Sequence, residues 1–273
     1  MGSSDQAVFE PKGESKSRIS GLVRQLAWGA LKLLYPPHCY LCNAPIAAEA
    51  GYICSTCYAG LPRPKPDEPE CARCGGPLTA GADADLCLDC ANRPWFFNEA
   101  RSFGFYEAGL AELVKGLKYG GERALARELA RYLLEAGEGL LARAEALTFV
   151  PLTEAKLHQR GFNQAELLAR ELSKLAKLPV VPALAKVRET ADQTALKPQE
   201  RLENVHGAFA PVGRARCERI LLVDDVYTTG ATAEECSRAL REGGYEEVYV
   251  LTVARTRWKE ASDGAQSQTQ ARA

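Results

Sequence analysis

Apolar runs alternate with amphipathic segments over the C-terminal two thirds of the chain. Strands are predicted at residues 100–106, 146–151, 205–210, 220–226 and 247–253, and helices at 111–117, 122–134, 162–176 and from about 231. The run Ile220–Val223 is continuously apolar, which is typical of a parallel strand covered on both faces. Strands that alternate with helices predict an α/β fold with a doubly wound, mainly parallel sheet.

The pattern changes towards both ends of the chain. The polar residues 1–18 predict a disordered leader, and residues 258–273 a disordered tail. Apolar positions within 19–35 share one helical stripe, which predicts an amphipathic docking helix or, as the alternative, a membrane-surface anchor. This stripe is too short to span a bilayer. Residues 36–98 are rich in Pro, Gly and Ala and predict a small module ahead of a larger domain at 99–257.

Eight of the ten cysteines form four Cys-x-x-Cys pairs, which are Cys39/Cys42, Cys54/Cys57, Cys71/Cys74 and Cys87/Cys90. Two pairs provide four thiolates for one tetrahedral ion, and zinc suits such loop-rich sequence better than an iron–sulfur cluster. Eleven residues separate the first two pairs and twelve separate the last two, which predicts two similar ribbons with two structural zinc ions. Interleaved pairing, first with third and second with fourth, is the alternative. Disulfides are disfavoured because no secretory signal precedes the cysteines, and a cytoplasmic protein is expected.

A turn of small and hydroxyl-bearing residues follows the strand at 220–226. Asp224 and Asp225 stand at the end of its apolar run, and the turn continues as Thr228, Thr229, Gly230, Ala231 and Thr232. Backbone N–H groups at a helix N-terminus suit a phosphate, and Gly230 allows close approach of the backbone. The two acids can accept hydrogen bonds from sugar hydroxyls. The segment therefore predicts a site for a ribose 5-phosphate beyond the carboxyl end of the strand.

Other phosphate-binding motifs fit the chain poorly, since it has neither a P-loop nor a Gly-x-Gly-x-x-Gly turn after a strand. The segment 220–232 instead resembles the signature of type I phosphoribosyltransferases, which bind phosphoribosyl pyrophosphate (PRPP). Basic residues at Lys156, His158 and Arg160 suit a pyrophosphate group, although an ordinary solvated turn is the alternative. The polar stretch from 186 to 205 predicts either a mobile lid or a solvated loop.

Several segments together resemble the ComF family. The matching motifs are Arg-Gly-Phe-Asn-Gln-Ala at 160–165, Arg-x-x-Asn-Val-x-Gly-x-Phe at 201–209, Asp-Asp-Val-Tyr-Thr-Thr-Gly-Ala-Thr at 224–232, and the four cysteine pairs. The resemblance covers residues 20–257 and implies a double zinc ribbon followed by a type I phosphoribosyltransferase fold. It also implies that Asp224 and Asp225 bind the ribose hydroxyls of PRPP and that Thr228–Thr232 bind its 5-phosphate. Lys115, Lys118 and Tyr119 match a lysine-rich stretch of the family, with no role assigned.

The resemblance implies a Mg²⁺-dependent phosphoribosyltransferase that releases pyrophosphate. Asp224, Asp225, Arg160 and Lys156 are then the catalytic candidates, and Mg²⁺ would bind mainly through substrate oxygens. No segment identifies the acceptor. The family is associated with DNA uptake in competent bacteria, so the alternative is a non-catalytic protein that senses PRPP, or handles single-stranded DNA together with competence proteins.

Composition narrows these alternatives only slightly. The 273 residues carry a net charge of −1, so overall basicity does not indicate nucleic acid as a partner. With 46% hydrophobic and 25% charged residues, the chain can form one full α/β domain and a small module. Aromatic residues near the ribbons could stack on bases or fill a small core, and these are Tyr40, Tyr52, Tyr58, Trp95, Phe96 and Phe97.

Overall fold

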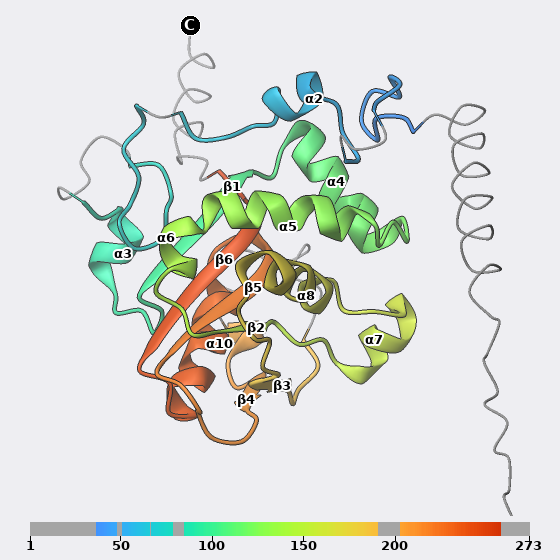
Figure 1. Cartoon of the computed structure of the whole chain (residues 1–273). Coiled ribbons are helices and arrows are strands. Elements are labelled where there is room, and N and C mark those ends of the chain that lie inside the picture. The colour runs from blue at the N-terminus through green and yellow to red at the C-terminus, as the bar shows by residue number, and fades with distance from the viewer. Residues whose placement is uncertain (1–36, 48–50, 66, 79–84, 191–202, 258–273) are drawn as a thin grey trace, which may run out of the picture. The chain divides into compact units, whose positions relative to one another are not determined.

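The computed structural model describes residues 37–47, 51–65, 67–78, 85–190 and 203–257 (Figure 1). The expected leader, docking helix and tail lie outside these residues. The chain divides into two compact units, residues 1–55 and 56–273. Within the described ranges, no helix combines the length and the apolar character needed to cross a membrane.

A four-stranded parallel sheet forms the centre of the second unit. Its strands are β1 (Glu99–Phe105), β2 (Ala146–Phe149), β5 (Arg219–Tyr227) and β6 (Glu247–Arg255), in the order β1-β6-β5-β2. Leu222 pairs with Val250 and Asp224 with Thr252 in the two central strands. A separate antiparallel pair joins β3 (Leu184–Lys186) to β4 (Phe209–Pro211). This architecture confirms the expected α/β class with a mainly parallel sheet.

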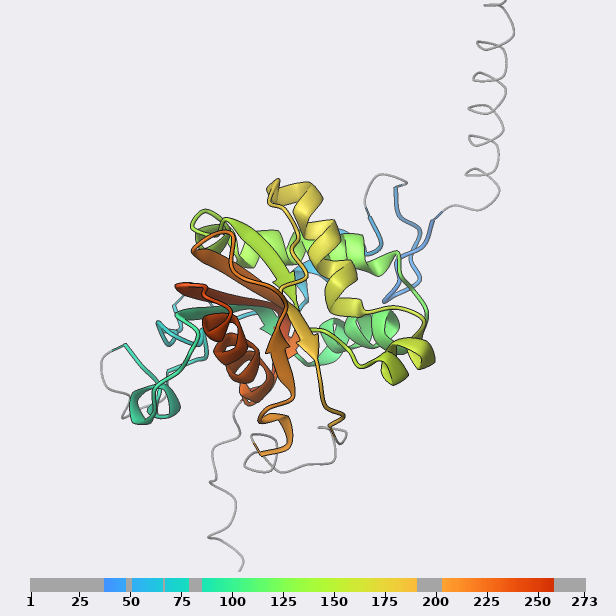
Figure 2. The ribbon, with the colours of Figure 1, turned by 90° about the horizontal axis from the view of Figure 1, so that it is seen from below.

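Helices cover both faces of the sheet, as Figure 2 shows. The helices are α2 (Ser55–Ala59), α3 (Leu88–Asn92), α4 (Ala108–Tyr119), α5 (Leu125–Ala136), α6 (Glu138–Leu141), α7 (Glu154–Arg160), α8 (Gln164–Ala176) and α10 (Ala231–Glu242). Helix α10 packs on β5 and β6 from one side, whereas α5 packs on β1 and β6 and α8 on β2 and β5. Because neither face of β5 meets solvent, its apolar run is continuous and does not alternate.

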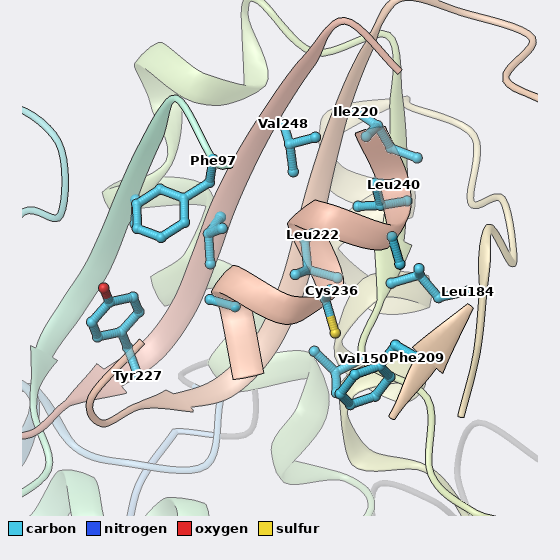
Figure 3. Close-up of a cluster of buried hydrophobic side chains, with 14 of the residues drawn as sticks. Phe97, Val150, Leu184, Phe209, Ile220, Leu222, Tyr227, Cys236, Leu240 and Val248 are labelled. Carbon is cyan, nitrogen blue, oxygen red and sulfur yellow. The ribbon is translucent and has the colours of Figure 1, made fainter. Parts of the chain in front are cut away.

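The core beneath α10 joins several segments that are distant in the sequence (Figure 3). Ile220 and Leu222 of β5 and Val248 of β6 meet Cys236 and Leu240 of α10 there. All five side chains are completely buried. Burial also raises the pKa of the Cys236 thiol well above its usual value, so this cysteine is a packing residue.

Two of the expected elements are wrong in detail. Residues 203–205 are helical, so the strand predicted at 205–210 is limited to β4. The basic residues after β2 lie on helix α7 and not in a turn, because Thr153 accepts a hydrogen bond from the backbone N–H of Lys156 and caps the helix. Gly161, with φ at 75°, ends α7 in the left-handed region.

Asn163 connects the start of α8 to the end of β2. Its Oδ1 accepts hydrogen bonds from the backbone N–H groups of Ala165 and Glu166, and its Nδ2 donates to the carbonyl of Val150 at 3.0 Å. We expect Asn163→Ala to lower the free energy of unfolding by about 1–2 kcal/mol, since both functions are lost. Asn163→Asp keeps the cap and loses only the donor, so urea unfolding should place it between the wild type and Asn163→Ala. An alanine variant as stable as the wild type would contradict this.

Candidate functional site

The two ribbons repeat the same local geometry. Cys39 N–H donates to the carbonyl of Ala44 at 2.7 Å, and Cys71 N–H donates to that of Gly76 at the same distance. The fifth residue of each turn is left-handed, with φ at 58° for Asn43 and 63° for Gly75. The second cysteine pair of each ribbon leads into a short helix, α2 or α3. The expectation of two similar ribbons in tandem is confirmed.

The thiols gather in two groups of four, Cys39, Cys42, Cys54 and Cys57, and Cys71, Cys74, Cys87 and Cys90. Within each group all Sγ atoms lie within 4.8 Å of one another. The Sγ atoms of Cys42 and Cys54 are 3.7 Å apart, as are those of Cys74 and Cys87. Four thiolates around zinc at about 2.3 Å are separated by about 3.8 Å. The groups are therefore Cys₄ zinc-binding sites, paired in sequence order and not interleaved.

Zinc requires thiolates, and the surroundings of one cysteine in each site favour that form. Burial would raise the pKa of Cys39, but backbone N–H groups, including those of Cys42 and Cys54, outweigh it and lower this pKa to about 6. In the second site a hydrogen bond with Cys90 lowers the pKa of Cys74 to about 4 against the effect of burial, and the charge of Arg255 adds to this lowering. In the same site, burial raises the pKa of Cys87 to about 11, and the hydrogen bond with Cys74 raises that of Cys90.

The expected phosphate loop connects β5 to α10. Gly230 caps the helix with φ at 79°, and Thr229 Oγ1 accepts from the N–H of Ala231 at 3.4 Å. A Cβ atom on Gly230 would lie 2.4 Å from Tyr227 Oη, so the residue must be glycine for packing as well as for its backbone conformation. Thr256 N–H donates to the carbonyl of Tyr227 at 3.0 Å, which ties the loop to the end of β6.

The paired acids have different environments. Asp225 is 4% exposed, and its Oδ1 forms an ion pair with Lys118 Nζ of α4 at 2.8 Å. Burial would lower the pKa of Lys118, but the charges of both acids raise it, so the lysine is cationic. Asp224 is only partly exposed and accepts from the N–H of Asp225 at 2.8 Å. Burial, together with the negative charge of Asp225, raises the pKa of Asp224 to about 7.

Further cations gather near these acids. Burial and the positive charge of Lys156 lower the pKa of Lys186 of β3, and the negative charge of Asp224 offsets part of this lowering. Lys186 is thus within electrostatic range of both Lys156 on α7 and Asp224. Arg160 lies over the ring of Tyr119, 5.3 Å from its centroid, and Tyr119 follows Lys118 in the sequence. Sequence reasoning included Lys186 only as the start of the polar stretch 186–205 and gave Lys118 no role, because no local spacing relates either residue to β5.

A small cleft lies where Asp224 and the loop meet. Its cavity volume is about 10 Å³, and it is lined by Val150, Leu222, Asp224, Val226, Tyr227, Thr228, Gly230, Thr232, Ala233, Val250 and Thr252. Asp224 and three residues of the expected phosphate loop thus border the same space. The central part of the expected lid, residues 191–202, lies outside the described residues.

The aromatic residues near the ribbons fall into two groups. Tyr58 packs against Phe103 and Tyr132, and the buried Phe97 packs against Trp95 and Tyr227. These contacts fit the expectation of a small core. Tyr40, Tyr52 and Phe96 are exposed at 40%, 39% and 45%.

Comparison with known proteins agrees with this arrangement. Residues 30–91 match the family model of the double zinc ribbon domain. The chain is 32% identical to the DNA utilization protein YhgH of Salmonella typhi over 232 residues, which are 82% of this chain and 99% of the relative. The chain belongs to the ComF family. Other members include Competence protein F of Haemophilus influenzae (30% identity, 80% of this chain, 96% of the relative) and Competence protein ComFC of Bacillus subtilis (27%, 81% and 85%).

Solved structures with some similarity include phosphoribosyltransferases. A glutamine PRPP amidotransferase from B. subtilis matches with 22% identity and a TM-score of 0.33, over 51% of this chain and 30% of that protein. A purine phosphoribosyltransferase from Pyrococcus horikoshii matches with 17% identity and a TM-score of 0.29, over 48% of this chain and 84% of that protein. The fold of this ComF-family chain is therefore assigned from its own strand order.

The raised pKa of Asp224 makes stability depend on pH. An unfolded Asp titrates near pH 4 and folded Asp224 near pH 7, so the contribution of this group to stability falls as the pH rises between these values. Asp224→Asn keeps an acceptor for the N–H of Asp225 and cannot ionise. We expect its free energy of unfolding to exceed that of the wild type by at least about 1 kcal/mol at pH 8, and by less at pH 5.

Urea unfolding at both pH values measures this difference. Asp67→Asn, at an exposed position, is the matched control and should show no pH-dependent gain. A gain in Asp224→Asn that is equal at pH 5 and pH 8 would show that the acid does not titrate in this range.

Proposed function

We propose that this ComF-family protein binds PRPP with Mg²⁺ in the cleft beyond β5 and transfers the phosphoribosyl group with release of pyrophosphate. The observation that carries the proposal is the junction of β5, loop and α10, where Asp224 and the first residues of the helix border one cleft and the buried Asp225 follows directly in the chain. Phosphate suits the helix N-terminus and the loop hydroxyls, and the ribose diol suits the carboxylates. We also propose that the protein is cytoplasmic.

The acids are suited to hold the ribose. Asp225 Oδ1 forms an ion pair with Lys118, whereas Oδ2 has no hydrogen-bond partner among the described residues. Asp224 borders the cleft and retains accepting capacity once it is ionised. Carboxylate oxygens are also the ligand type that Mg²⁺ prefers, so both acids are candidates to hold the ion together with substrate oxygens.

The cations are suited to hold the pyrophosphate. The mutual repulsion of Lys156 and Lys186 would be relieved by an anionic ligand between them. In the reaction the acceptor forms a bond to C1 of the ribose while the bond from C1 to pyrophosphate breaks, and the electron pair leaves with pyrophosphate. Fixed cations stabilise the charge of this leaving group, and Asp224 and Asp225 stabilise the positive charge that develops on the ribose ring.

Calorimetry with PRPP and Mg²⁺ tests the binding site. The wild type should bind saturably and, because Asp224 ionises near pH 7, more tightly at pH 8 than at pH 6. Asp224→Asn should lose this pH dependence, and Asp224→Asn/Asp225→Asn should bind at least about tenfold more weakly. The charge-matched control is Glu166→Gln/Glu171→Gln on α8, which should bind as the wild type does. Equal affinity in the double variant and the wild type would refute the site.

Pyrophosphate release from PRPP tests catalysis. Bases, amines and nucleic acids are screened as acceptors, and with a productive acceptor Arg160→Ala should be at least about tenfold slower than the wild type. Arg170→Ala on α8 removes the same charge from an exposed ion pair with Glu166 and should not change the rate. If PRPP binds and no acceptor yields pyrophosphate, the protein is a PRPP sensor or a DNA-handling protein and not a transferase.

A role with single-stranded DNA is the second candidate, because relatives are named for competence and DNA utilization. Tyr119 is 69% exposed beneath Arg160, and Arg123 lies 4.6 Å from the ring centroid of Phe162. Aromatic rings with adjacent cations suit unpaired bases and their phosphates. Titration with labelled single-stranded DNA over a salt series distinguishes this function, because phosphate contacts give a steep salt dependence.

A further inference from the structure

Arg255 is a buried arginine side chain that has no carboxylate partner among the described residues. It ends β6 and is 1% exposed. In the part of the chain that the structure describes, it forms no ion pair with Asp or Glu, and its Nε has no hydrogen-bond partner. Burying an uncompensated guanidinium costs several kcal/mol, so a negative charge is required nearby.

The second Cys₄ site supplies the nearest thiolates. Arg255 Nη1 donates to the carbonyl of Cys74 at 2.6 Å, and Nη2 lies 3.9 Å from Cys74 Sγ. A Cβ atom on Gly76 would lie 2.6 Å from Nη2, so glycine leaves room for the guanidinium beside the ribbon. Four thiolates around one Zn²⁺ carry a net charge of −2, which is the charge that Arg255 needs.

Arg255 also contacts the strand end that carries the phosphate loop. It pairs with Tyr227 across β5 and β6, and its Cζ lies 5.2 Å from the centre of the Tyr227 ring. The position of a Gly230 Cβ would be 2.8 Å from Tyr227 Cζ, so the ring packs directly on the loop. The second zinc site, Arg255, Tyr227 and Gly230 thus form a continuous series of contacts.

The chain that follows the second ribbon makes a parallel connection. Trp95 Cζ3 would lie 3.1 Å from a Cβ on Gly230, and the backbone N–H of Phe96 donates to Glu234 in the first turn of α10 at 2.9 Å. Arg241 Nε donates to the carbonyl of Phe96 at 3.0 Å. This segment reaches the loop and both ends of α10, while Phe97 packs edge-on against Tyr227 (Figure 3).

We propose that Arg255 is the buried counter-cation of the second zinc site and that this contact makes the zinc a structural support of the phosphate loop. Arg255 is a positioning residue, since it acts on the loop through Tyr227. The link to PRPP rests on the function proposed above, whereas the links to zinc and to the loop conformation do not.

The test compares the wild type with Arg255→Met, which keeps an unbranched apolar stem and removes the guanidinium and its charge. Arg101→Met is the matched control, because Arg101 hydrogen-bonds the carbonyl of Ala72 in the same ribbon but has its own partner in Glu99. Each zinc-loaded protein is mixed with excess chelator, and alkylation mapped by mass spectrometry identifies the cysteines that each lost ion exposes. Hydrogen exchange of residues 226–232 reports on the loop, and calorimetry reports on PRPP.

Arg255→Met should release the second zinc about tenfold faster or more, with the first site as internal reference. Loop exchange should rise about threefold or more, and the affinity for PRPP should fall with it. If zinc release from the second site is unchanged, or is accelerated equally at both sites, Arg255 is not the counter-cation of the second site. Faster zinc release with unchanged loop exchange overturns the support of the loop. If the wild type fails to bind PRPP, the proposed function is refuted. The rates of zinc release and of hydrogen exchange then still test the role of Arg255.

If Arg255→Met does not fold, the support of the loop by zinc can be tested with the wild type alone. Chelation of its second zinc should raise hydrogen exchange in residues 226–232 and at the end of β6. Unchanged exchange after loss of that ion overturns the proposal.

Discussion

The burial of β5 on both faces is the constraint on which the rest of the structure depends. Helix α10 covers one face and α8 the other, so the strand tolerates only apolar residues through Val223. The first polar side chains after this run are Asp224 and Asp225, near the carboxyl end of β5. The left-handed Gly230 then turns the chain into α10, which places a helix N-terminus beside the acids.

Two adjacent carboxylates at a buried strand end need compensation. Lys118 neutralises Asp225 from α4, and Asp224 is left with a raised pKa because burial and its neighbour both disfavour its charge. Lys186 adds positive charge within electrostatic range of Asp224, and Lys156 acts on Lys186 in turn. The site therefore contains closely placed charges of both signs, an arrangement suited to a ligand with a diol at one end and phosphates at the other.

The second zinc ribbon belongs to the same compact unit as the sheet. Arg255 joins its cysteines to β6, and Trp95 and Phe96 join the following segment to the loop and to α10. A ribbon with little core of its own is stabilised by its metal and by these contacts. The metal site and the cleft are consequently supported by the same buried side chains.

The sequence by itself determined the features that local order encodes: the apolar run of β5, the acids and loop that follow it, the helix that became α8, and the cysteine pairs. The spacing of the cysteine pairs also favoured sequential zinc pairing. Only the positions of the Sγ atoms in the folded chain excluded the interleaved alternative. Helix α7 was not predicted, because its basic residues were interpreted as part of a turn and the N-cap at Thr153 was not recognised. Tertiary structure alone decided the partners of the charges, Lys118 with Asp225 and Arg255 with Cys74. These residues are far apart in the chain, and a buried charge selects its partner through packing and desolvation, which leave no periodic signal in the sequence.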